Sequence, residues 1–185
     1  MEIIFIILIL VALILAIVVL FASRLPDTWS IENAVLVKAS PRQLYSLLDS
    51  LENWPTWTVW NNQNEASLSF SYPAHRSGVG AVQIWQSTRL SGRLTLTKSN
   101  LDREIQYEFL FKQSNLLIKG TLAVAAADLE YSQLGWRLVL SPVKSFNPVT
   151  RYLAYNLRQS FELDIADSLS NLVTIFEPET QREAE

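Results

Sequence analysis

The side chains that commonly perform acid–base or metal chemistry are scarce in this sequence of 185 residues. His75 is the single histidine, it stands beside Arg76, and no cysteine is present. A general base needs an orienting partner within reach, and a structural zinc site needs several cysteine or histidine ligands. The sequence also contains no carboxylates clustered at metal-ligand spacing and no nucleophile-elbow, phosphate-loop or dinucleotide-binding motif. It therefore predicts no catalytic residue, no metal site and no cofactor.

Aromatic residues give the positive signal for a binding site. Three of the six tryptophans fall within residues 54–60. Aromatic rings offer a ligand a large contact area, and tryptophan or tyrosine adds one polar group that orients it. Eight residues are predicted to surround a pocket for a hydrophobic ligand: Trp57, Trp60, Trp85, Tyr107, Phe109, Trp136, Tyr152 and Tyr155. The alternative is that these rings fill the core, as aromatic residues often do.

The faces of the predicted strands bear on this choice. Trp85 is out of phase with Val82 and Ile84, so only one of the two sets can point toward the interior. Arg89, Arg93 and Lys119 also lie in predicted strands. We expect them on the outer face, although an inward one could pair with an acidic ligand head group.

Residues 148–176 are predicted to form one long amphipathic helix. Pro148 suits the first turn of a helix, and Pro178 follows the last apolar position. A helix cannot bury an apolar face alone, so a sheet or other helices must cover it. The apolar positions recur every three or four residues, which places them on one face: Leu153, Leu157, Phe161, Ile165, Leu169, Leu172 and Phe176.

The stretch before this helix reads mainly as strands. Residues 30–39 alternate as a first strand, Ser40 and Pro41 then begin a helix, and a short helical turn follows at 50–54. Six further strands are predicted at residues 67–72, 80–89, 92–99, 104–112, 116–127 and 134–143. Short links make the sheet antiparallel, and a sheet this long must curl. The predicted class is α+β, with a curved sheet of about seven strands wrapped on the C-terminal helix.

The N-terminus carries a candidate membrane anchor. Residues 3–22 are twenty apolar residues without a polar side chain, and at about 1.5 Å per residue they span roughly the 30 Å of a bilayer core. A cleaved signal peptide fits less well, because Glu2 stands where a positive charge is usual and the run exceeds about 7–15 residues. The predicted organisation is an anchor at 1–24, a linker at 25–29, one domain at 30–178 and a polar tail at 179–185.

Charge bears on partners and on orientation. Arg24, Lys38 and Arg42 follow the span and no Lys or Arg precedes it, so the positive-inside rule places the domain on the cytoplasmic side of a bacterial-type plasma membrane. A domain in the periplasm is the alternative. The net charge is −3 without a basic stripe, which argues against nucleic acid. The expected partners are the membrane and a hydrophobic small molecule or lipid, and the sequence names no protein partner.

Several motifs in residues 29–176 resemble a known family. They are the Ser40-Pro41 helix start, the run Trp54-Pro55-Thr56-Trp57, and the turn Gly78-Val79-Gly80-Ala81 before Trp85. Together with the order of elements they resemble the START-like superfamily, or SRPBCC, and within it the polyketide cyclase/dehydrase and lipid transport group. The resemblance implies a helix-grip fold around a hydrophobic cavity. Known members bind lipids, sterols, polyketides or other bulky apolar molecules, and some are enzymes.

Three hypotheses for function follow. The first is a single-pass membrane protein whose helix-grip domain binds a hydrophobic small molecule or lipid. The second is a cyclase- or dehydratase-like enzyme in which tyrosine, arginine or His75 moves protons in the cavity. The third is an interaction module whose interior is filled by its own tryptophans.

Overall fold

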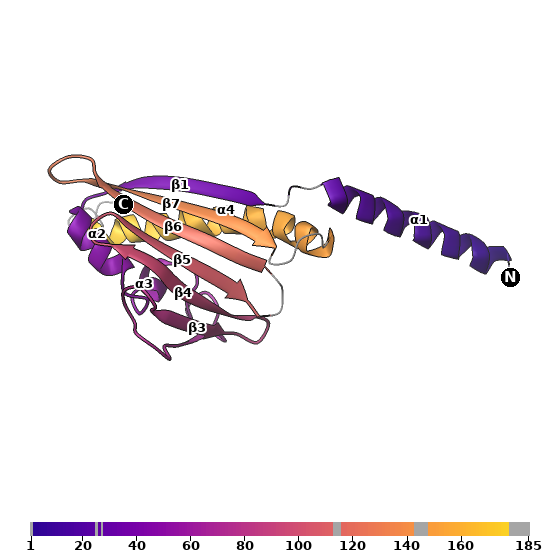
Figure 1. The fold of residues 1–185 in the computed structure, drawn as a ribbon, viewed down its shortest axis with the longest axis horizontal. Helices are drawn as coiled ribbons and strands as arrows, with labels where there is room; N and C mark the ends of the chain where they lie inside the picture. Colours follow the sequence, from indigo (N-terminus) through magenta and orange to yellow (C-terminus); the bar gives the residue numbers. More distant parts are fainter. Residues whose placement is uncertain (1, 25, 27, 113–115, 143–147, 178–185) are drawn as a thin grey trace.

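A computed structural model describes residues 2–24, 26, 28–112, 116–142 and 148–177. Seven antiparallel strands form one curved sheet, and the helix α4 (Pro148–Phe176) lies along one face of it (Figure 1). The predicted α+β class, with a curved sheet on a long C-terminal helix, is confirmed. The predicted polar tail at 179–185 lies outside the described residues.

The sheet brings the first and last strands of the domain together. Its order is β1-β7-β6-β5-β4-β3-β2, so all neighbours except the β1–β7 pair are consecutive in the chain, and residues 72–81 between β2 and β3 are the longest of their links. The strands β2 and β3 are shorter than predicted, and β3 ends where Ser87 accepts a hydrogen bond from the Leu90 backbone and turns the chain. The strands are β1 (Trp29–Val37), β2 (Ser69–Ser71), β3 (Val82–Gln86), β4 (Ser91–Asn100), β5 (Glu104–Phe111), β6 (Leu116–Ala126) and β7 (Ser132–Pro142).

Two short helices close one end of the sheet. The helix α2 (Pro41–Leu48) begins as predicted, with Ser40 and Gln43 forming a reciprocal capping box. The second short helix is α3 (Trp54–Trp57), several residues later than the predicted 50–54. Proline is tolerated only in the first turn of a helix, so Pro55 fixes the start of α3, and the indole N–H of Trp54 donates to the Leu48 carbonyl at 2.8 Å.

Two glycines on the inner face of the sheet make room for aromatic rings. Gly92 pairs with Trp85, and Gly120 pairs with Tyr107. A Cβ at Gly120 would lie 2.0 Å from Cζ of Tyr107, and one at Gly92 would lie 2.6 Å from Cζ2 of Trp85. Each ring therefore lies over the backbone of the neighbouring strand, which only glycine allows at these positions.

The apolar face of α4 packs on the sheet as predicted. Ile165, Leu169 and Leu172 are buried, while Leu157, nearer the start of the helix, is half-buried. The side chain of Leu153 lies outside the described residues. The helix thus has a fully covered C-terminal half and a less covered N-terminal half.

The helix α1 (Glu2–Arg24) stands away from the sheet and contacts α4 (Figure 1). Residues Glu2–Phe21 have a mean hydropathy of 3.9, and none of them is buried. By length and composition this helix can cross a membrane, a property that it shares with signal sequences.

Candidate functional site

A cavity of about 240 Å³ lies between the sheet and the N-terminal half of α4. Its lining is nearly all apolar and comes from three parts of the chain. The inner face of the sheet supplies Trp85, Phe109 and Phe111, α4 supplies Phe161, and the segment after α3 supplies Trp60. The curved sheet therefore closes over α4 without filling the space between them.

The aromatic rings of the lining support one another. Trp85 stacks on Phe109, with centroids 5.3 Å apart and an interplanar angle of 11°. Phe111 meets Phe109 edge-on at 4.8 Å and Phe161 at 6.4 Å, and Phe161 meets Trp60 at 5.8 Å. Rings that contact each other in offset or edge-to-face geometry keep their positions. We call these five residues the aromatic belt.

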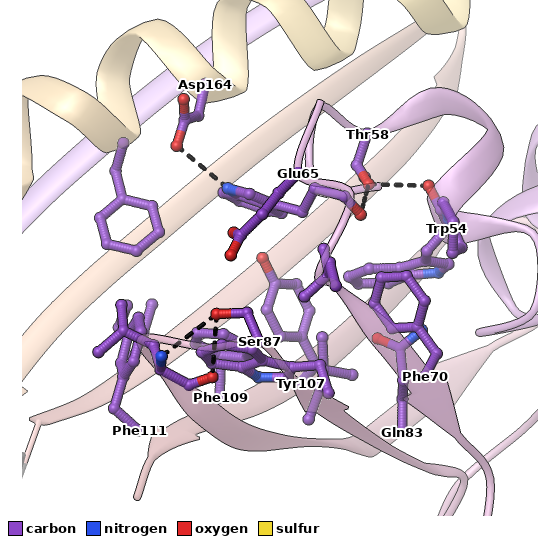
Figure 2. A pocket seen from close by; sticks show the side chains of 18 of the residues that line it. Trp54, Thr58, Glu65, Phe70, Gln83, Ser87, Tyr107, Phe109, Phe111 and Asp164 are labelled. Atoms are coloured by element: carbon purple, nitrogen blue, oxygen red, sulfur yellow. Dashed lines mark hydrogen bonds between the residues drawn. The ribbon is translucent and has the colours of Figure 1, made fainter. Parts of the chain in front are cut away.

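The segment that carries Trp60 is held against α4 by hydrogen bonds. The hydroxyl of Thr58 donates to the Trp54 carbonyl at 2.8 Å, which closes the end of α3. The backbone N–H of Val59 donates to Ser168 Oγ at 3.0 Å, and Trp60 Nε1 donates to Asp164 Oδ2 at 3.1 Å. The two acceptors are one helical turn apart, so they lie on the same face of α4. Figure 2 shows Asp164 reaching from α4 toward this indole nitrogen.

Two polar side chains lie in the inner part of the cavity. The hydroxyl of Tyr107 accepts a hydrogen bond of 2.9 Å from Trp136 Nε1, and no acceptor for its own proton is present among the described residues. Burial raises the pKa of Tyr107 well above its usual value, so the phenol stays neutral. Gln83 donates from its amide nitrogen to the Leu51 carbonyl and to Tyr72. Trp85 Nε1, also in the lining, is buried without a hydrogen-bond partner among the described residues. The cavity thus offers a ligand free donors at Tyr107 and Trp85.

The mouth of the cavity is acidic. Its exposed lining residues are Glu65, Leu90 and Ser160, and Asp164 beside them is half-buried. Burial raises the pKa of Asp164, the hydrogen bond from the Trp60 indole opposes that rise, and the nearby Asp167 adds to it. Figure 2 shows the Glu65 side chain extending from its loop toward the cavity.

The structure brings together half of the residues predicted from sequence. Trp60, Trp85, Tyr107 and Phe109 line the cavity. Trp57 and Trp136 are fully buried in the core beside it, with centroids 5.2 Å apart. Tyr152 and Tyr155 lie on an exposed part of α4, 47% and 43% exposed, away from the cavity. Their direct contact with a ligand remains a prediction, as it does for the other predicted residues.

Sequence reasoning missed other residues of the lining. Phe111 shares the inner face of β5 with Tyr107 and Phe109, and Phe161 belongs to the apolar face of α4, so both could have been found by periodicity. No sequence signal marks Glu65 or Asp164 as residues of the cavity mouth. The exposed His75 is not part of the lining.

The sequence left open whether Trp85 or the set of Val82 and Ile84 faces the interior, and Trp85 does so in the structure. Trp85 points inward and Ile84 is 39% exposed on the other face, while Val82 at the start of the strand is also buried. Arg93 and Lys119 are exposed, as predicted for the outer face, whereas Arg89 is exposed in the β3–β4 hairpin and not in a strand. The two charged residues that line the cavity are therefore both acidic.

Comparison with models of known protein families and with curated proteins finds no match to this sequence.

Solved structures do match it. XoxI from Bacillus cereus has a TM-score of 0.57 at 17% identity, covering 80% of this chain and 94% of that chain. The hypothetical protein jhp0584 from Helicobacter pylori has a TM-score of 0.59 at 11% identity, covering 80% of this chain and 88% of that chain.

Norcoclaurine synthase from Thalictrum flavum, solved in complex with dopamine and hydroxybenzaldehyde, is also similar. Its TM-score is 0.57 at 12% identity, and the match covers 82% of this chain and 90% of that chain. XoxI and norcoclaurine synthase share a sheet and a C-terminal helix in a Bet v1/SRPBCC-like arrangement. The chain described here has that fold.

Proposed function

We propose that this protein is a membrane-anchored binder of a small hydrophobic molecule or lipid, which it holds in the cavity between the sheet and α4. The observation that carries the proposal is the cavity itself, because well-packed interiors contain few voids larger than a water molecule. Its aromatic belt gives a ligand large apolar contact, and Tyr107 supplies a free donor.

The volume of the cavity limits the ligand. Ligand pockets commonly measure about 300–1,000 Å³, and this one measures about 240 Å³. Since a water molecule occupies about 30 Å³ of the liquid, the cavity has room for a small aromatic molecule or a short alkyl chain. A larger lipid would have to leave part of its length at the mouth. One structural neighbour holds two small organic molecules in this fold.

The position of the mouth favours a membrane source for the ligand. Four residues separate the end of α1 at Arg24 from the start of β1 at Trp29, so the two ends lie at most roughly 18 Å apart. Leu90 lies in the β3–β4 hairpin, at the sheet end where β5 and β7 finish and β1 begins. Figure 1 shows α1 leaving the domain at this end. An apolar ligand is most concentrated in a bilayer, and an anchor at this end keeps the mouth close to it.

The proposal is tested with the full-length chain purified from membranes in phosphatidylcholine nanodiscs. Denaturing mass spectrometry should recover a hydrophobic compound that copurifies with the wild type. Leu90→Trp should reduce its yield several-fold, because an indole at the mouth obstructs entry. Leu129→Trp is the matched control, since Leu129 is fully exposed in the β6–β7 hairpin at the other end of the sheet.

Equal recovery from both variants would show that the compound binds elsewhere. No compound from the wild type, together with no binding of the neutral fluorophore N-phenyl-1-naphthylamine, would refute the binding function.

A further inference from the structure

The cavity opens beside a second, polar hollow. This outer hollow, of about 360 Å³, shares Trp60, Glu65, Leu68 and Asp164 with the lining of the inner cavity. It adds Asp167 to the two carboxylates already at the mouth. An apolar chamber is therefore continuous, through shared residues, with a hollow that carries three acidic side chains.

These carboxylates have no positive partner within the described part of the chain. None of Glu65, Asp164 and Asp167 takes part in any of the five ion pairs found there. Arg89, next in sequence to the lining residue Leu90, is exposed on the β3–β4 hairpin and does not line either hollow. Arg158 lies over the Trp29 ring at 5.1 Å instead.

The carboxylates retain capacity to accept hydrogen bonds from a ligand. Asp164 receives one bond from Trp60, and Glu65 receives one from Ser67, whereas a carboxylate has about four lone-pair positions. Burial and the neighbouring Asp167 both raise the pKa of Asp164. A positive charge placed at the mouth would relieve both of these unfavourable effects.

A second observation inside the cavity also points to a ligand. Tyr107 is 3% exposed and lines the cavity, and its hydroxyl proton has no acceptor among the described residues. Trp85 Nε1, which also lines the cavity, is buried without any hydrogen-bond partner among the described residues. Buried donors normally have a partner, so both groups point to a ligand that fills the cavity.

We propose that the ligand is a cationic amphiphile, with an apolar body in the aromatic belt and an ammonium group between Glu65 and Asp164. This inference rests on the proposed function and adds the chemical class of the ligand. A fatty acid or another anionic amphiphile is disfavoured at the same mouth by like-charge repulsion. A metal ion is a weaker candidate, because the described residues hold no group of three side chains arranged to bind one.

The expected preference for a cationic ligand follows from the attraction between its ammonium group and a carboxylate at the mouth. An opposite charge within about 4–6 Å shifts the pKa of a carboxyl group by about 1–3 units. By linkage the same coupling appears as about 10- to 1,000-fold in ligand affinity. Because Asp164 is only half-buried and Glu65 is exposed, solvent screening places the expectation near the lower end, at about tenfold.

Three probes with one alkyl tail test the charge preference: octylamine, octan-1-ol and octanoate. The full-length chain in phosphatidylcholine nanodiscs is loaded with N-phenyl-1-naphthylamine at pH 7, and displacement is measured against empty nanodiscs. Octylamine should displace the fluorophore at about tenfold lower concentration than octanoate, with octan-1-ol between them. Asp164→Asn keeps an acceptor for Trp60 and should reduce this ratio several-fold. Glu162→Gln removes one exposed charge from the same helix outside both hollows, and should leave the ratio unchanged.

The outcomes separate the inference from the proposed function. If octan-1-ol displaces the fluorophore but octylamine shows no advantage over octanoate, the cavity binds ligands and the cationic class is wrong. An advantage that Asp164→Asn and Glu162→Gln reduce equally would also overturn the inference, because it would reflect the overall charge of the protein. If no probe displaces a fluorophore that Leu90→Trp still binds, the cavity is not the site and both proposals fail.

Discussion

Two neighbouring parts of the interior use the same residue types and differ in how completely they are filled. In the solid part, Trp54, Trp57, Tyr107 and Trp136 contact one another with centroids 5.0–5.6 Å apart, and α3 supplies two of the indoles. In the hollow part, the rings of the aromatic belt contact each other around a cavity of about 240 Å³. Tyr107 and Trp54 belong to both parts.

The difference lies in what covers the sheet. Over the solid part, α3 presses two indoles against the sheet and the buried half of α4 completes the layer. Over the hollow part, the N-terminal half of α4 and the segment after α3 cover the sheet, and Trp60 is held at the mouth by its bond to Asp164. Aromatic content therefore does not distinguish a core from a binding site in this fold. The position of the covering helix does.

The largest expected effect compares leucines in the two parts of α4. Leu172→Ala should destabilise the domain by about 2–5 kcal/mol, because Leu172 is fully buried and its removal leaves a new void. Leu157→Ala should cost less than about 2 kcal/mol, since this side chain is half-buried and already borders a cavity. Urea unfolding of the full-length protein, followed by tryptophan fluorescence, measures both. Equal losses would mean that the cavity end is packed as tightly as the core.

The sequence predicts the first part of this comparison better than the second. Strand alternation on β5 and the three- and four-residue spacing on α4 are local patterns, and they correctly place Tyr107, Phe109 and Leu172 on inner faces. Whether an inward ring ends in the core or at the cavity depends on contacts distant in sequence. Trp57 and Trp60 are three residues apart, yet the first is fully buried in the core and the second lies at the mouth.

The acidic mouth could not be predicted from the sequence, for a similar reason. Glu65 and Asp164 are far apart in the chain and meet only because the segment after α3 is bonded to α4. Tyr152 and Tyr155 are exposed, and this could not be predicted either, because the helical spacing of α4 does not show where the sheet ends beside it.

The next effect concerns the glycine beneath Tyr107, a ring that both parts share. Gly120→Ala should destabilise the domain by about 1–3 kcal/mol or more, because its Cβ would lie 2.0 Å from Tyr107 Cζ in a fully packed setting. Gly135→Ala is the matched control, since its Cβ would meet nothing closer than the Ala123 carbonyl oxygen at 4.0 Å. Thermal unfolding of both variants decides the matter. If their unfolding midpoints agree, the Tyr107 ring has room to shift, and the packing where the two parts meet is not tight.

The smallest effect concerns the pH dependence contributed by Asp164 at the hollow end. Its pKa is raised in the folded protein, chiefly by burial, so the folded state holds this proton more tightly than the unfolded chain. The corresponding stability is present below the unfolded pKa of about 3.9 and is lost as pH rises through the higher folded pKa. Asp164→Asn does not titrate, and should therefore gain stability relative to the wild type between pH 3 and pH 7. Because the group is half-exposed, we expect less than about 1 kcal/mol.

The unfolding free energies of the wild type and Asp164→Asn at the two pH values give this difference directly, since all other titrating groups except the neighbouring Asp167 largely cancel. Glu162→Gln should show no comparable change with pH. Saturating octylamine should abolish the gain of Asp164→Asn at pH 7, because an ammonium at the mouth favours the charged carboxylate. A gain that persists unchanged with octylamine would show that Asp164 does not face the ligand, and the hollow part would then differ from the solid part in packing alone.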